Sequence, residues 1–170
     1  MKIKKTKFKN TFIINHKKKL DKRGYFMRGY CENELKKRGV NFKIKQSNYS
    51  FNKEKFTFRG FHYQTAPYSE SKIINCVSGK LLLLLVNIDK KSPNYLKKLK
   101  FILGSDMNKS ILIFKDCATA FLTLESKTLV HYYMSSFFKN GKARGINYMD
   151  PKLKINLPKK PKVISKRDLS

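Results

Sequence analysis

A histidine, a lysine and a tyrosine in this sequence have the side chains needed to move a proton on and off carbon. His62 stands in the stretch KFTFRGFHYQTAPYSESK, ten residues before Lys72, and Tyr132 follows much later. An imidazole can accept a proton, an ammonium can stabilise the resulting enolate, and a phenol can return a proton to the carbanion. The three residues therefore indicate acid–base chemistry beside a carbonyl group.

The strand-like pattern around His62 predicts how these groups are positioned. Because side chains alternate along a strand, His62 is expected to point to one face and Arg59 to the other. The same alternation puts Lys72 and Ile74 on one face of the next strand. A hairpin with Pro67 in its turn is then expected to bring Lys72 beside His62.

The remaining histidines and cysteines do not indicate a second site. His16 lies in NHKKK and is interpreted as a solvated loop residue, while His131 precedes two tyrosines and is typical of a packed or surface strand residue. A metal site in a barrel needs two or three neighbouring imidazoles, and the chain has no HxH pair. Three cysteines without a CxxC pair argue against a disulfide framework or zinc. We expect no metal and a reducing, cytoplasmic compartment.

Short runs rich in Ile, Val, Phe and Tyr, separated by Gly, Pro, Asn, Asp or Ser, predict an all-β sandwich or barrel. The runs are TFIINH, FKIKQSNYSF, KFTFRGFHY, SKIINCVSG, KLLLLLVNID, LKFILG, SILIFK, TAFLTLE and LVHYYMSS. One short helix is predicted in CENELKKRG, with Gly39 as its stop. The length fits a single domain over 1–170, and the Pro-rich residues from about 151 to 170 are expected to form an extended tail on the barrel.

The chain is strongly basic, with 39 Lys+Arg against 11 Asp+Glu and a formal net charge of +28. Such a charge attracts nucleic acid, anionic lipid or a phosphorylated substrate. Only six of the cations are arginine, the residue that makes bidentate phosphate and base contacts, and the lysines are dispersed. This pattern favours a compositional bias over a nucleic-acid surface. The run LLLLLVNI falls far short of the roughly 20 residues that span a bilayer, so no membrane partner is expected.

Eight short blocks occur in the order and spacing of one enzyme family. The blocks are DKRGYF (21–26), QSNYS (46–50), RGFHYQ (59–64), ESK (70–72), VSGK (77–80), SPNY (92–95), MDPKLKINLP (149–158) and ISKRD (164–168). On these blocks, from about residue 10 to the end, the chain resembles the dTDP-4-dehydrorhamnose 3,5-epimerase family, known as RmlC. Eight ordered blocks are much harder to match by chance than one motif.

The resemblance implies a cupin-type jelly-roll barrel, usually a homodimer, that acts without a metal or cofactor on a nucleotide-linked 4-keto-6-deoxy sugar in surface-polysaccharide or deoxysugar biosynthesis. In that chemistry the keto group acidifies the C3 and C5 protons, a base removes one, and a phenol reprotonates the opposite face. The resemblance identifies His62 as the base, Tyr132 as the acid, Lys72 as the group that stabilises the enolate oxygen, and Asp168 as the carboxylate that orients His62. It also implies substrate contacts at Arg59, Arg23, Gln46, Asn48, Arg28, Thr119 and Phe138.

Some positions depart from the family pattern. FKDCATAF stands where the family has PxGFAHGF, so Thr119 replaces a histidine and Phe114 a proline. Phe138 replaces a second tyrosine, and Ala143 replaces a glutamate. The open outcomes are a slower double epimerisation, epimerisation at C3 alone, a related 4-keto sugar as substrate, or an impaired relative that only binds a sugar nucleotide. The alternative from another class is a basic nucleic-acid-binding protein.

Overall fold

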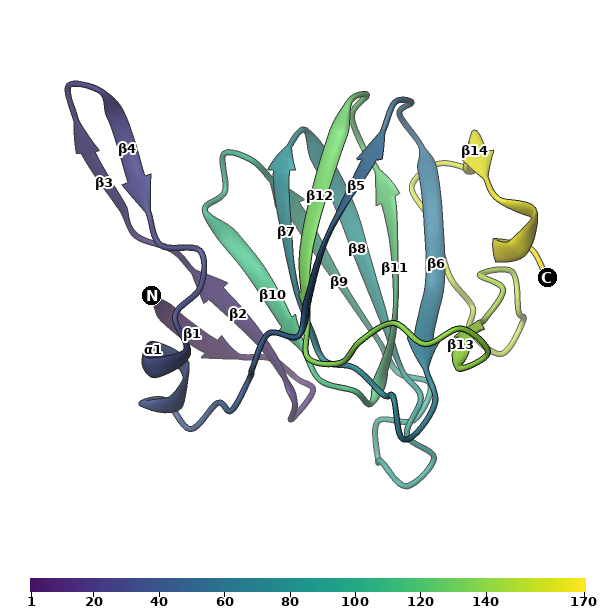
Figure 1. Ribbon diagram of the computed structural model, residues 1–170. Coiled ribbons are helices and arrows are strands. Elements are labelled where there is room, and N and C mark those ends of the chain that lie inside the picture. The colour runs from purple at the N-terminus through teal and green to yellow at the C-terminus, as the bar shows by residue number, and fades with distance from the viewer.

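Two β-sheets face each other and enclose the interior of the protein (Figure 1). The computed structural model describes residues 1–170. Sheet I has the strand order β1 (Lys2–Lys5), β2 (Thr11–Asn15), β10 (Lys109–Ile113), β7 (Lys72–Ser78), β12 (Thr128–Met134) and β5 (Gln46–Asn52). Sheet II has the order β13 (Ala143–Gly145), β6 (Thr57–Gln64), β11 (Cys117–Thr123), β8 (Lys80–Asn87) and β9 (Lys98–Gly104), with β14 (Val163–Ile164) parallel to β6.

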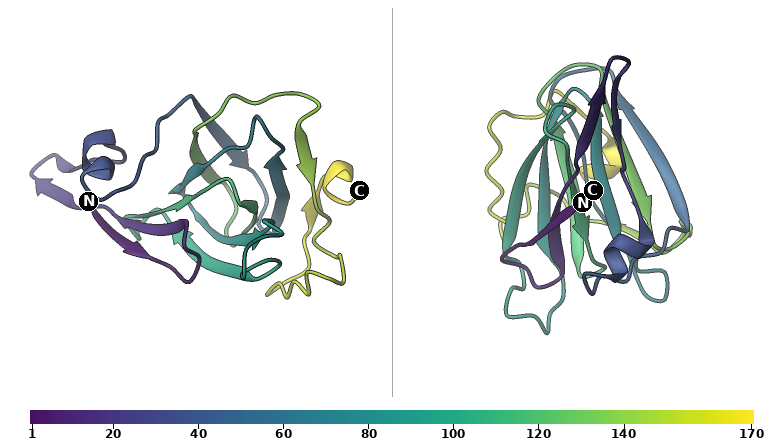
Figure 2. Two further views of the ribbon diagram at one scale, coloured as in Figure 1. Left: turned by 90° about the horizontal axis from the view of Figure 1, so that it is seen from below. Right: turned by 90° about the vertical axis from the view of Figure 1, so that its left-hand side faces the viewer.

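Three smaller elements lie outside the two sheets. The hairpin of β3 (Lys18–Asp21) and β4 (Gly24–Met27) projects from one side of the two sheets. The C-terminus lies on the opposite side (Figures 1 and 2). The helices are α1 (Glu32–Lys36) and the 3₁₀ helix η1 (Lys166–Asp168). Neither helix has the length and apolar character needed to cross a membrane.

All nine predicted runs contain strands, and the all-β jelly-roll prediction is confirmed. From β5 to β8 successive strands alternate between the two sheets, as they do again from β9 to β12. The predicted helix is also present. Gly39, at φ +73°, follows it, and the amides of Gly39 and Val40 donate to the carbonyls of Lys36 and Leu35. This pattern of bonds is the Schellman ending that favours glycine.

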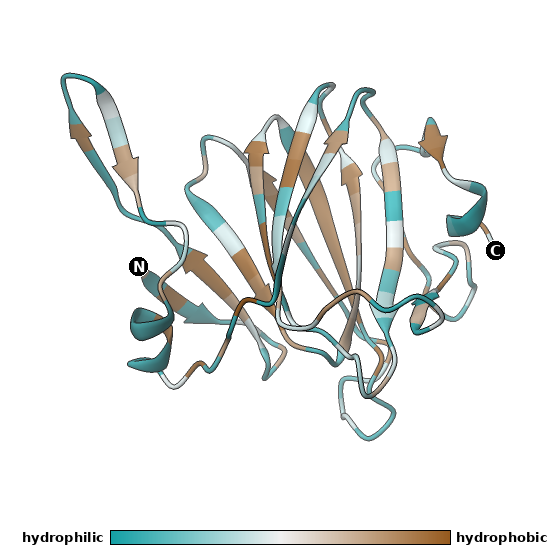
Figure 3. Ribbon diagram, in the orientation of Figure 1, coloured by the Kyte–Doolittle hydropathy of each residue, from teal (hydrophilic) through white to brown (hydrophobic).

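Strand β8 is apolar throughout because both of its faces are buried. Leu81, Leu83 and Leu85 point into the core between the sheets, with residues such as Ile74 and Val130. Leu82, Leu84 and Val86 belong to a second cluster, which includes Phe58, Phe61 and Leu153. Figure 3 shows β8 as hydrophobic over most of its length. A strand covered on both faces has no need of polar alternation.

The C-terminal segment covers the outer face of sheet II. Leu153 is buried there, and Ile155, Leu157 and Ile164 pack against the same cluster. The ammonium of Lys98 on β9 donates to the carbonyl of Leu153 at 2.6 Å, and β14 pairs with β6. These contacts bring the last residues of the chain to the edge of the strand that carries His62.

The predicted hairpin between the strands of His62 and Lys72 is wrong. Strand β6 pairs with β11 and β13 in sheet II, whereas β7 pairs with β10 and β12 in sheet I. Residues 65–71 carry the chain from one sheet to the other. Lys72 therefore reaches toward β6 across the interior, and not from a neighbouring strand.

The predicted separation of Arg59 and His62 onto opposite faces is also wrong. In the pairing of β6 with β11, His62 is opposite Thr119 and Arg59 is opposite Phe121, with a register shift between them. From Arg59 to His62, β6 advances three residues while β11 advances only two, from Phe121 to Thr119. One extra residue on one strand of a pair is a β-bulge. The extra residue turns Arg59 and His62 toward the same cavity.

The turn between β7 and β8 depends on Gly79. Its φ is +75°, and a Cβ placed there would lie 2.5 Å from Thr128 Oγ1. We predict that Gly79→Ala lowers the free energy of unfolding by about 1–2 kcal/mol for the backbone conformation and by roughly 1–3 kcal/mol more for the clash. Urea unfolding followed by circular dichroism measures the loss.

Gly39→Ala is the matched control for this substitution. Gly39 has nearly the same φ, +73°, but no atom lies within 4 Å of the position that a Cβ would take there. It should lose the backbone contribution alone. Equal losses in the two variants would contradict the steric argument.

Candidate active site

A pocket of about 470 Å³ opens between the two sheets. Its volume lies within the range of about 300–1,000 Å³ that is usual for small-molecule sites. Sheet II contributes Arg59, His62 and Thr119 to its wall, and sheet I contributes Lys72 and Tyr132. The candidate base His62, the candidate acid Tyr132 and Lys72 therefore all line the same cavity.

His62 is held by a carboxylate from the end of the chain. Its Nε2 donates to Asp168 Oδ1 at 2.7 Å, and the amide of Gly60 donates to Asp168 Oδ2 at 3.3 Å. Asp168 is 7% exposed, and Ser165 caps η1 by accepting from the amide of Asp168. A buried carboxylate fixes the tautomer of an imidazole and stabilises its protonated form. The other ring nitrogen, Nδ1, makes no hydrogen bond within the chain, so it can accept a proton.

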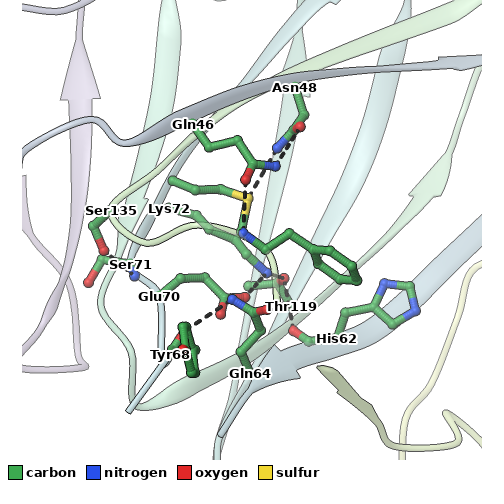
Figure 4. A network of polar contacts seen from close by, with 12 residues as sticks. Gln46, Asn48, His62, Gln64, Tyr68, Glu70, Ser71, Lys72, Thr119 and Ser135 are labelled. Atoms are coloured by element: carbon green, nitrogen blue, oxygen red, sulfur yellow. Dashed lines mark hydrogen bonds and ion pairs between the residues drawn. The ribbon is translucent and has the colours of Figure 1, made fainter. Parts of the chain in front are cut away.

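Lys72 lies between an acid and a hydroxyl, as Figure 4 shows. Its ammonium is 2.9 Å from Glu70 Oε1 and donates to Thr119 Oγ1 at 3.2 Å. Thr119 in turn donates to the carbonyl of His62 at 3.4 Å. An ammonium has three N–H donors, so one is left for a ligand. Lys72 and His62 are thereby connected across the interior through Thr119.

Tyr132 lies on β12, in the sheet opposite to His62. Burial raises the pKa of Tyr132, and the charge of Glu70 raises it further, while the charge of Arg59 acts in the opposite direction. The phenol is therefore protonated at neutral pH and can act as a proton donor. The imidazole and the phenol approach the cavity from facing walls.

Arginines are concentrated at the pocket although they are scarce in the chain. Arg59, Arg144 and Arg167 all line it, which is half of the six arginines. Arg59 Nε donates to Asn52 Oδ1 at 2.8 Å, and this bond leaves both terminal nitrogens available. Arg144 and Arg167 were not among the residues that the sequence indicated. The scarcity of arginine in the chain was the one feature of the sequence that could have drawn attention to them.

Polar and aromatic groups at one end of the cavity complete the wall. Gln46 donates to Asn48 Oδ1 at 2.9 Å and accepts from the amide of Phe138 at 2.8 Å (Figure 4). Asn48 also contacts Met134 Sδ at 3.1 Å. The ring of Phe138 is half-exposed. The sequence indicated Gln46, Asn48 and Phe138, and the structure places all three at the pocket.

Two predicted contact residues do not reach this pocket. Arg23 lies at the tip of the β3–β4 hairpin, where its side chain is 90% exposed and pairs with Asp21 at 2.7 Å. Arg28 follows the same hairpin and pairs with Glu34 at 2.9 Å. Because the hairpin projects away from the barrel, these arginines lie apart from the cavity of their own chain (Figure 1).

The other histidines are structural. His16 is not solvated as expected. It is 9% exposed, donates from Nδ1 to the carbonyl of Arg28 at 3.0 Å and accepts at Nε2 from Ser110 at 2.8 Å. His131 lies between Ser47 and Asn75 outside the pocket. Burial lowers the pKa of both His16 and His131, which keeps them neutral.

The two buried cysteines, Cys76 and Cys117, do not provide a nucleophile. Burial raises the pKa of Cys76 and of Cys117 to about 12. A thiol must be deprotonated to attack, so both are inert near neutral pH.

Comparison with known proteins gives one consistent result. The family model for dTDP-4-dehydrorhamnose 3,5-epimerase matches residues 5–170. A dTDP-4-dehydrorhamnose 3,5-epimerase of Sinorhizobium fredii is 29% identical over 159 residues, covering 93% of this chain and 82% of the relative. One from Shigella flexneri is 28% identical over 171 residues, covering 100% and 94%.

Solved structures agree with these sequence relatives. The crystal structure of dTDP-4-dehydrorhamnose 3,5-epimerase from Bacillus anthracis, with TDP and PPi bound, has a TM-score of 0.94 at 28% identity and covers 98% of this chain and 95% of its own. The epimerase from Legionella pneumophila, in complex with dTDP-4-keto-L-rhamnose, has a TM-score of 0.92 at 25% identity, with coverages of 98% and 89%.

Proposed function

The chain belongs to the dTDP-4-dehydrorhamnose 3,5-epimerase family, and we propose that its pocket performs this epimerisation with His62 as base and Tyr132 as acid. The protein is an isomerase that inverts carbon centres of a nucleotide-linked 4-keto-6-deoxy sugar. The observation that carries the residue assignment is the placement of the imidazole and the phenol on facing sheets. Inversion requires a proton to leave one face of a carbon and another to arrive at the opposite face.

The reaction begins at a carbon next to the C4 ketone. His62 Nδ1 takes the proton from C3 or C5, and the electron pair moves onto the C4 oxygen as an enolate. The third N–H of Lys72 stabilises that oxygen, and the carboxylate of Asp168 stabilises the imidazolium. Tyr132 then donates its proton to the carbon from the other face. Exchange with water returns His62 to the neutral form and Tyr132 to the phenol.

The nucleotide part of the substrate is anchored by positive charge. A diphosphate carries at least two negative charges, and guanidinium groups bind phosphate oxygens in pairs. Arg59, Arg144 and Arg167 provide such groups at the pocket. We assign the diphosphate to this cluster. The gathering of half of the arginines around one pocket favours a small phosphorylated ligand over nucleic acid.

The proposal includes a homodimer. The β3–β4 hairpin exposes Leu20, Tyr25 and Phe26, and the edge strand β5 exposes Tyr49 and Phe51. Exposed apolar groups and an uncovered strand edge are features of an interaction surface. We assign these surfaces to contacts between two copies, with the hairpin of one copy extending Arg23 toward the pocket of the other.

A cytoplasmic location is part of the same proposal. All three cysteines are free thiols. Free thiols are typical of proteins in a reducing compartment.

The assignment of the base predicts the behaviour of a His62→Ala variant. Wash-in of solvent deuterium at C3 and C5 of the dTDP-linked 4-keto-6-deoxy sugar should fall by roughly 10²–10⁴-fold, as is typical when a general base is removed. Proton NMR in deuterium oxide measures the exchange. His131→Asn changes a histidine on β12 that lies outside the pocket, so it is the matched control and should retain exchange. A His62→Ala variant with the wild-type rate would refute the assignment.

The wall of the pocket also predicts unequal reaction at the two carbons. Tyr132 can serve one position well, whereas Phe138 has no hydroxyl to donate, and the Thr119 hydroxyl is already bonded to Lys72 and to the carbonyl of His62. We expect deuterium to enter C3 faster than C5. Phe138→Tyr should narrow the difference between the two rates. Equal rates in the wild-type enzyme, followed in one NMR time course, would contradict this prediction.

The proposal that Arg23 of one copy completes the pocket of the other copy is tested by mixing two defective variants. Arg23→Ala and His62→Ala should each have low exchange activity. In a mixed dimer, one pocket has both its own His62 and the Arg23 of the other copy. Random mixing puts such a pocket in about a quarter of all sites, so about a quarter of the wild-type activity should return.

Two measurements decide the outcome of this mixing experiment. Sedimentation equilibrium must give twice the chain mass. The mixture must also regain activity that neither variant has alone. A monomeric protein, or a mixture no more active than the sum of its parts, would overturn the assignment of Arg23 to the neighbouring pocket.

A further inference from the structure

Glu70 is the only acidic residue among those that line the pocket. It lies two residues before Lys72, at the end of the segment that leads into β7. Its side chain is 3% exposed, and its Oε1 is 2.9 Å from the Lys72 ammonium. Its other oxygen, Oε2, is buried and has no hydrogen-bond partner. A buried carboxylate in a pocket for an anionic ligand requires an explanation.

Neither stability nor ligand binding explains this carboxylate. The desolvation of a buried ion pair offsets much of its attraction, so such pairs rarely stabilise a fold relative to apolar residues. A buried oxygen without a partner is unfavourable in addition. The negative charge also opposes a diphosphate. What Glu70 does provide is a fixed point for the ammonium of Lys72.

A lysine side chain has a long, flexible stem, so its ammonium must be held if it is to act as a preorganised donor. Thr119 on β11 and Glu70, just before β7, each occupy one direction around the Lys72 nitrogen (Figure 4). Together they leave one N–H for the ligand. We propose that Glu70 is a positioning residue that acts through Lys72 and aims its ammonium at the enolate oxygen.

The catalytic effect of Glu70 rests on the proposed function. The contacts that hold the Lys72 ammonium do not depend on it. Glu70 does not donate a proton and does not contact the reacting carbon.

The first experiment separates turnover from binding in Glu70→Gln. We expect kcat for deuterium exchange to fall by about 10–1,000-fold, because loss of one oriented donor at a developing oxyanion has effects of this size. KM and the affinity for dTDP should change by no more than about threefold, since neither depends on the enolate. Glu70→Asp, which keeps the charge, should recover part of the rate. The matched control is Glu125→Gln, which removes a carboxylate paired with Lys80 at 3.6 Å outside the pocket.

A double-mutant comparison tests whether Glu70 acts through Lys72. In the background of Lys72→Met, replacing Glu70 by Gln should cause little further loss of exchange, because the ammonium is already gone. The double variant also has no unpaired buried charge, which avoids the instability expected of Glu70→Gln alone. Independent losses that multiply in the double variant would overturn the proposal.

A spectroscopic readout tests the geometry without turnover. In the free protein, an ammonium held by Glu70 and Thr119 should exchange its protons slowly and give a ¹H–¹⁵N signal that disappears in Lys72→Met. That signal should broaden or vanish in Glu70→Gln, and Glu70→Asp should partly restore it. An unchanged signal in Glu70→Gln would overturn the positioning role. Absence of exchange in the wild-type enzyme with the expected NMR result would instead refute the proposed function alone.

Discussion

The contact between Asp168 and His62 depends on almost every other feature of the fold. Asp168 is near the end of the chain and reaches His62 only because the C-terminal segment is packed on the outer face of sheet II. That packing requires an apolar outer face, which β8 provides through Leu82, Leu84 and Val86. The unbroken run of leucine in β8 is therefore linked to the chemistry. Its inner residues build the barrel, and its outer residues retain the segment that orients the imidazole.

The bulge in β6 has a comparable role for the substrate. In a regular strand, Arg59 and His62 would point in opposite directions, one into the cavity and one away from it. The register shift against Thr119 and Phe121 turns both inward. It also lets Phe61 point outward into the cluster beneath the C-terminal segment. One irregularity thus places a cation and a base in the pocket while keeping the outer face apolar.

Much of the fold was predictable from local patterns, because strands, turns and the ending of α1 are encoded over a few residues. The pairing of strands was not. A jelly roll alternates between sheets, so β6 and β7 are neighbours in sequence but not in hydrogen bonding, and nothing in residues 65–71 distinguishes a crossing from a hairpin. Lys72 was still found, because alternation along β7 fixes its face whichever sheet holds it. Glu70 lies before β7 in the crossing segment, so alternation along the strand gave no indication of where it points. Gly60 was the available signal for the bulge, because a glycine inside a strand pattern often marks one and its φ of +118° is a conformation that other residues rarely adopt.

The lysines and the arginines of this basic chain are distributed differently. Lysines are spread over the surface, whereas half of the arginines line one cavity. Within that cavity only Lys72 represents lysine, and it is held by Glu70 and Thr119. A mobile lysine ammonium is sufficient on a surface in contact with water. A cation that must be oriented needs either the rigid plane of a guanidinium or neighbouring groups that hold a flexible lysine stem. Thr119 fits this requirement, because its hydroxyl can accept from Lys72 while it donates to the carbonyl of His62. The residue that departs from the family pattern is thus part of the structure that connects the two walls of the pocket.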